Sequence, residues 1–89
     1  MLEMLIEEIL KILEKIETFK WKKEVEDKSY SYQTKVNGIE YFILRDACFR
    51  NSLRIIDESN NTQDYPNISG KISKQIDSLV FKINNQREE

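Results

Sequence analysis

Apolar side chains crowd the first sixteen positions of the chain, and no glycine or proline interrupts them. Two series repeat every seven residues: Leu2, Ile9 and Ile16 form one, and Leu5, Ile12 and Phe19 form the other. Ile6 and Leu13 widen this stripe, whereas Met4 and Leu10 fall outside it. The pattern predicts an amphipathic helix over Leu2–Glu17 that needs a cover over much of its circumference.

From Phe19 the apolar period changes to two, which is typical of a half-buried strand. The first predicted strand presents Phe19, Trp21, Lys23 and Val25 on one face, and the second presents Tyr30, Tyr32, Thr34 and Val36. The dipeptide Asn37-Gly38 indicates a type I′ hairpin turn, because both residues tolerate a positive φ. The third predicted strand, Ile39–Arg45, is apolar on both faces, which is typical of a central strand. A fourth strand is expected over Ser52–Glu58.

The polar stretch Ser59–Asp64 predicts a loop, and Tyr65-Pro66-Asn67 leads from it into a second helix. Asn67 or Ser69 is the expected N-cap of that helix. Its apolar stripe consists of Ile72, Ile76, Leu79 and Ile83, to which Ile68, Val80 and Phe81 add.

These elements predict one α+β domain over residues 1–89, with an N-terminal helix, a four-stranded antiparallel β-meander and a C-terminal helix. Two arrangements stay open. If both helices share one face of the sheet, the other face exposes part of Phe42 and Leu44, or of Ile39, Tyr41 and Ile43. If the helices take opposite faces, each side of the third strand has its own cover.

The composition argues against most chemistry. The sequence has no histidine and one cysteine, so it lacks the commonest general base and metal ligand and predicts no metal, no cofactor and no enzymatic activity. A single cysteine and an interrupted apolar start favour a cytoplasmic protein without a signal peptide or membrane span. Cys48 is expected to behave as a small, buried hydrophobe. Asp57, Glu58 and Asp64 match no cation-binding loop and are expected to be solvated.

The N-terminal helix is the strongest candidate for contact with a partner, either another protein or a second copy of the chain. Leu2, Leu5 and Ile9 lie on its heptad side, which packs on the sheet or forms an interface. Met4 and Leu10 lie off that side, and we expect them to reach a partner.

An alternative function is the binding of a nucleic acid or nucleotide through Trp21, Lys22, Arg45 and Arg54. The formal charge of −2 and the acidic residues that follow Lys23 disfavour it. The competing interpretation places Trp21 in the core and pairs Arg45, Arg50 and Arg54 with Asp46, Asp57 or Glu40 as surface salt bridges.

Several segments resemble those of small uncharacterised bacterial or phage α+β domains. They are Lys20-Trp21-Lys22 after a leading helix, the hairpin around Asn37-Gly38-Ile39, the strand Leu53-Arg54-Ile55-Ile56-Asp57, and a closing helix after Tyr65-Pro66. The resemblance implies an adaptor, immunity protein or inhibitor and transfers no catalytic residue.

Overall fold

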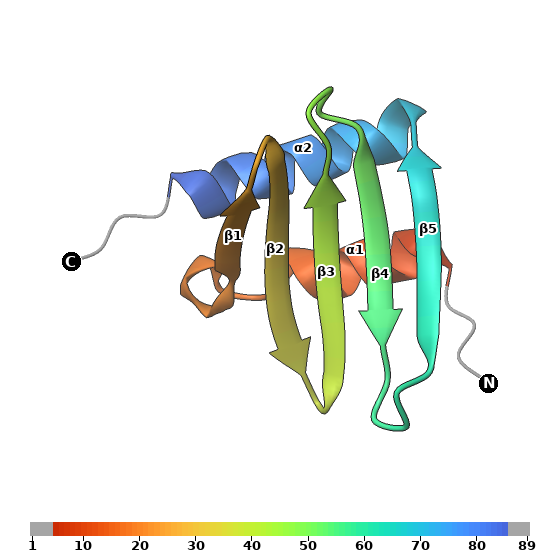
Figure 1. The fold of residues 1–89 in the computed structure, drawn as a ribbon. Coiled ribbons are helices and arrows are strands. Elements are labelled where there is room, and N and C mark those ends of the chain that lie inside the picture. The colour runs from red at the N-terminus through yellow and green to blue at the C-terminus, as the bar shows by residue number, and fades with distance from the viewer. Residues whose placement is uncertain (1–4, 86–89) are drawn as a thin grey trace.

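The computed structural model describes residues 5–85 and shows one layer of strands backed by one layer of helices (Figure 1). The elements run in the order α1 (Ile6–Glu14), the 3₁₀-helix η1 (Thr18–Lys20), β1 (Lys22–Glu26), β2 (Ser29–Val36), β3 (Ile39–Arg45), β4 (Asn51–Ile56), β5 (Thr62–Ile68) and α2 (Gly70–Asn84). The α+β class and the antiparallel sheet between two helices are confirmed. The sheet, however, has five strands rather than four.

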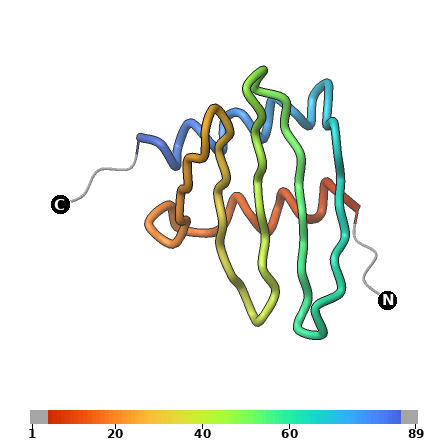
Figure 2. Tube along the Cα trace, in the orientation of Figure 1, coloured from red at the N-terminus to blue at the C-terminus, as the bar shows by residue number. Residues whose placement is uncertain are grey.

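The five strands form a simple meander in the order β1-β2-β3-β4-β5 (Figure 2). Asn37 and Gly38 both adopt positive φ angles, 51° and 81°, and Val36 pairs with Ile39 across the turn. The predicted Asn37-Gly38 hairpin is therefore confirmed. The preceding turn also contains a residue with positive φ, Asp27 at 58°. β3 has β2 on one side and β4 on the other, as its two apolar faces predicted.

The predicted loop over Ser59–Asp64 is confirmed for Ser59–Asn61 and wrong beyond it, because β5 begins at Thr62 and pairs with β4. Polar residues such as Asp64 have low strand propensity, so the sequence signal is weak. Pro66 lacks an N–H group and is tolerated because β5 is an edge strand. The pairing with β4 shifts register between Asn51 and Leu53, next to the part of β5 that contains Pro66.

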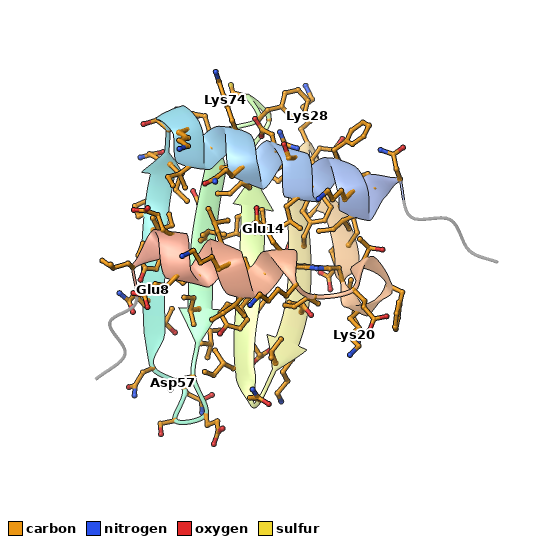
Figure 3. The ribbon with its side chains drawn as sticks, turned by 180° about the vertical axis from the view of Figure 1, so that it is seen from behind. Glu8, Glu14, Lys20, Lys28, Asp57 and Lys74 are labelled. Carbon is orange, nitrogen blue, oxygen red and sulfur yellow. The ribbon has the colours of Figure 1, made fainter. Side chains whose placement is uncertain are left out.

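Both helices lie on the same face of the sheet, which decides between the two arrangements that the sequence left open (Figure 3). They also contact each other. The core between the layers combines residues from both helices and from the inner face of the strands. Its most deeply buried members are Ile9, Leu13, Tyr32, Ile43, Leu53, Ile55, Ile76 and Val80.

The helix boundaries differ from the predicted ones at several points. α1 ends at Glu14 rather than Glu17, and its predicted start at Leu2 lies outside the described residues. Thr18–Lys20 forms a 3₁₀-helix instead of the start of a strand, which turns Phe19 outward with 61% of its surface exposed. A short turn after α1 interrupts the alternation that the sequence suggested for Phe19 and Trp21.

α2 confirms its predicted stripe, because Ile76, Leu79 and Ile83 are buried. Ser69 occupies the N-cap position without a side-chain hydrogen bond to the helix. Phe81 was expected to add to the stripe, but 69% of its surface is exposed. Its neighbour Val80 takes the inward position instead, because successive residues of a helix point in different directions.

Candidate functional site

Most of the heptad side of the N-terminal helix packs into the core: Ile9 and Leu13 are buried, and Ile6, Ile12 and Ile16 pack against them. Two positions differ from the predicted pattern. Leu10 was expected to reach a partner, yet only 2% of its surface is exposed, and Ile9 is fully buried beside it. Leu5, on the heptad side that was expected to pack on the sheet or form an interface, is 68% exposed. Leu2 and Met4 lie outside the described residues.

The physical reason is the position of α1 within the helix layer. Its inward residues are Ile6, Ile9, Leu10 and Leu13, spaced i, i+3, i+4, i+7 as expected for one face of a helix. α1 packs against both the sheet and α2, so Leu10 is buried together with the residues of the heptad side. The heptad pattern therefore predicted most of the inward side of the helix but not that Leu10 belongs to it.

The four residues of the proposed anion-binding set do not come together. Trp21 is buried in the core, where it offers no exposed ring for stacking, while Lys22 is exposed on β1. Arg45 lies on the helix-covered side of the sheet and pairs with Asp77 of α2 at 3.1 Å. Arg54 is paired with Phe42 of β3 and lies on the same face of the sheet as Phe42. Phe42 precedes Arg45 by three residues, and successive residues of a strand alternate between faces, so Arg45 and Arg54 point to opposite faces.

The uncovered face of the sheet, called the open face from here on, carries a small apolar cluster. Phe42 and Leu44 follow one another on this side of β3, and Ile56 lies diagonally across from Phe42 on β4. All three side chains are half-buried, and no helix among residues 5–85 covers them (Figure 1). One of the two exposure patterns expected for helices sharing a face, that of Phe42 and Leu44, is thereby confirmed.

Hydrogen-bonded polar pairs surround this apolar cluster. Gln33 donates from Nε2 to Glu40 Oε2 at 2.9 Å, and Arg54 donates from Nε to Asp64 Oδ1 at 2.7 Å. The Arg54 pair joins residues directly opposite in the β4–β5 ladder, and the hydrogen bond that Arg54 donates to Asp64 raises the pKa of Arg54 above its usual range. Both members are largely exposed, so the pair contributes only about 0–1 kcal/mol.

A shallow depression of about 310 Å³ adjoins the apolar cluster at the β1–β2 end of the sheet. Leu44 and the small side chains of Ser31 and Ser52 line it, together with Glu24 and Glu26 of β1. The open face is therefore hollowed beside Leu44 and acidic on one side.

On the covered side, Asn51 ties the sheet to α2. Its amide nitrogen donates to the Ser73 hydroxyl at 3.0 Å and to Asp77 Oδ1 at 2.9 Å, and the Ser73 carbonyl lies at 3.3 Å. Arg45 donates to the same oxygen of Asp77. No local pattern in the sequence indicates this network, because the partners of Asn51 are 22 and 26 residues away along the chain.

Two aspartates organise the hairpin loops rather than a cation site. Asp57 accepts hydrogen bonds from the backbone of Ser59 and Asn61, and the Asn61 bond is the main cause of its lowered pKa. Asp46 accepts from the backbone of Arg50 and Cys48 and from the Arg50 side chain, and the backbone bond from Arg50 contributes most to its lowered pKa.

The Arg50–Asp46 ion pair confirms one of the predicted surface salt bridges, whereas Arg45 and Arg54 pair with Asp77 and Asp64 instead. Cys48 lies exposed in the same loop, so the expectation that it is buried is wrong. Residues 5–85 contain no group of three or more histidine, cysteine or acidic side chains placed to hold a metal ion.

Comparison of the chain with protein-family models, with curated proteins and with solved structures finds no match. Across residues 5–85, neither helix has the length and apolar character needed to cross a bilayer.

Proposed function

We propose that this chain is a non-enzymatic, cytoplasmic protein-binding module, such as a small inhibitor, immunity or regulatory protein, and that it docks through the open face. The observation that carries the proposal is the apolar cluster of Phe42, Leu44 and Ile56 on a sheet face without a helical cover. The fold itself uses the opposite face for its core, so these side chains are available to a partner.

The surroundings of the apolar cluster support the same proposal. Protein interfaces combine a desolvated apolar centre with a polar, solvated rim. Here the rim contains the Gln33–Glu40 and Arg54–Asp64 pairs, and the depression beside Leu44 offers a recess for a partner side chain. The absence of histidine from the sequence supports binding rather than catalysis.

The free edges of the sheet favour docking on the face over pairing along an edge. Every residue of β1 is exposed, and four of its five side chains are charged, which discourages the addition of another strand. At the other edge, β5 contains Pro66, which cannot donate a backbone hydrogen bond.

The test compares Phe42→Lys on the open face with Phe81→Lys on the exposed side of α2. Tagged parent and variant proteins are used to capture partners from a lysate of the source cells, and light scattering reports self-association. We expect the parent and Phe81→Lys to retain the same partner, or the same dimer, and Phe42→Lys to lose it while keeping its circular dichroism spectrum. Equal retention by both variants would show that the open face is not the docking surface.

A further inference from the structure

A second surface lies where α1 ends, beside the β2–β3 turn, and it is basic although the whole chain has a formal charge of −2. Four exposed lysines border two adjacent depressions at this corner of the molecule (Figure 3 labels Lys20). These lysines, called the lysine corner from here on, are Lys15, Lys20, Lys22 and Lys35.

The first depression combines a basic rim with an apolar floor. Ile12, Ile16 and Val36 line it together with Lys15, Lys20 and Lys35, and its volume is about 490 Å³. Glu17 is its one acidic lining residue. An aliphatic side chain fits the floor, and a carboxylate beside that side chain would meet the lysine rim.

The second depression lies on the other side of Lys20 and Lys35 and measures about 420 Å³. Lys22 and the exposed ring of Phe19 border it. Lys22 is opposite Gln33 in the β1–β2 ladder, and Lys35 follows Gln33 by two residues on the same face of β2. Lys22 and Lys35 are therefore diagonal neighbours, whose Cα atoms are typically about 7–8 Å apart.

These lysines have no acidic partner within the described part of the chain. The ion pairs found among residues 5–85 all use arginine. Glu40 lies opposite Lys35 on β3, yet its carboxylate accepts a hydrogen bond from the Gln33 amide instead. Like charges on neighbouring side chains repel, and a bound anionic group would relieve this repulsion.

We infer that the lysine corner binds an acidic peptide segment of a partner protein, with an aliphatic side chain on the floor of the first depression and carboxylates on the lysines. Charge complementarity requires an acidic ligand, and the apolar floor requires side chains that a nucleic acid does not carry. The apolar cluster of Phe42, Leu44 and Ile56 lines neither depression, although Gln33 and Glu40 of its polar rim line the second one.

The test titrates the ¹⁵N-labelled chain with the peptide acetyl-EELEELEE-amide and with its glutamine counterpart acetyl-QQLQQLQQ-amide. We expect the acidic peptide alone to shift amide signals around Lys15, Lys20 and Lys35, and its affinity to fall as salt is added. The charge-reversed double variant Lys20→Glu/Lys35→Glu should bind about tenfold more weakly. The matched variant Lys71→Glu/Lys74→Glu changes the net charge by the same amount as the first double variant, but near the N-terminal end of α2. It should bind the peptide as the parent does.

Three outcomes would overturn the inference: equal binding of both peptides, equal loss in the two double variants, or tighter binding of a twelve-residue oligodeoxythymidine than of the acidic peptide at the same site. Leu44→Lys, at a position of the apolar cluster that lines neither depression, should leave peptide binding unchanged, so failure at the lysine corner is distinguishable from failure of the open face. Phe19→Ser should weaken binding several-fold. Phe81→Ser, which removes a similarly exposed phenylalanine from α2, should leave binding unchanged.

Discussion

β3 shows the contrast between the two faces of the sheet within three consecutive residues. Ile43 points toward the helices and is fully buried, whereas Phe42 and Leu44 on either side of it point to the open face and are half-buried. All three are large and apolar, so their hydrophobicity alone does not distinguish core from surface. The covered face supplies the stability of the fold, and the open face carries apolar area that the fold does not use.

The largest expected effect comes from a charge placed on the buried side of α1. Leu10→Asp puts a carboxylate into the core, where an unpaired charge is strongly unfavourable, and should destabilise the protein by more than about 4 kcal/mol. Leu5→Asp, on the exposed side, should change stability by less than about 0.5 kcal/mol. Circular dichroism and urea unfolding would separate the two, and a folded Leu10→Asp variant would place the core elsewhere.

Neighbouring truncations on β3 test the contrast between the faces directly. Ile43→Ala leaves a cavity between the sheet and the helices and should lower the free energy of unfolding by about 2–5 kcal/mol. Leu44→Ala removes a half-buried side chain from the open face and should lower it by about 1 kcal/mol or less. Similar losses in urea unfolding would mean that the two faces are equally important for stability.

The polar link between β4 and α2 should have an intermediate effect. Asn51→Ala removes an amide that donates to Ser73 and Asp77, and should lower the free energy of unfolding by about 1–3 kcal/mol. Ser52→Ala, one residue along and on the open face, is the matched control and should lower it by about 0.5 kcal/mol or less. Hydrogen exchange along α2 would show whether the Asn51 variant loosens this helix specifically.

Ion pairs on the open face should contribute little. Arg54→Gln breaks the exposed pair with Asp64 and should cost about 0–1 kcal/mol, with the difference shrinking in high salt. Thermal unfolding at low and high ionic strength measures it. A larger loss that is insensitive to salt would mean that this pair is shielded from solvent.

The acid response should come from the hairpin loops rather than from either face. The pKa values of Asp46 and Asp57 are lowered in the folded protein, mainly by backbone hydrogen bonds from Arg50 and Asn61 respectively. Their stabilising effect is therefore fully present above the usual aspartate pKa of 3.8 and is lost as the pH falls through the lower folded values. Asp46→Asn should flatten this part of the stability–pH curve, as measured by urea unfolding from pH 5 downward.

The sequence predicted features that depend on neighbouring residues. Asn37-Gly38 forms the expected turn because its positive φ angles are a local requirement, and Ile76, Leu79 and Ile83 bury the stripe that helical spacing indicated. The candidate sites were harder to predict. Leu10 was expected to reach a partner and is a core residue, Trp21 lies in the core as the competing interpretation predicted, and the lysine corner draws on three separate segments of the chain.

The sequence by itself determined the class of the fold, the hairpin at Asn37-Gly38 and the amphipathic character of both helices, because backbone propensity and side-chain period are local properties. Tertiary structure decided the rest. It recruited β5 by pairing with β4, placed both helices on one face, and turned Leu10 inward where α1 meets the sheet and α2. Those outcomes depend on contacts between distant segments, which the periodicity of a single segment does not encode.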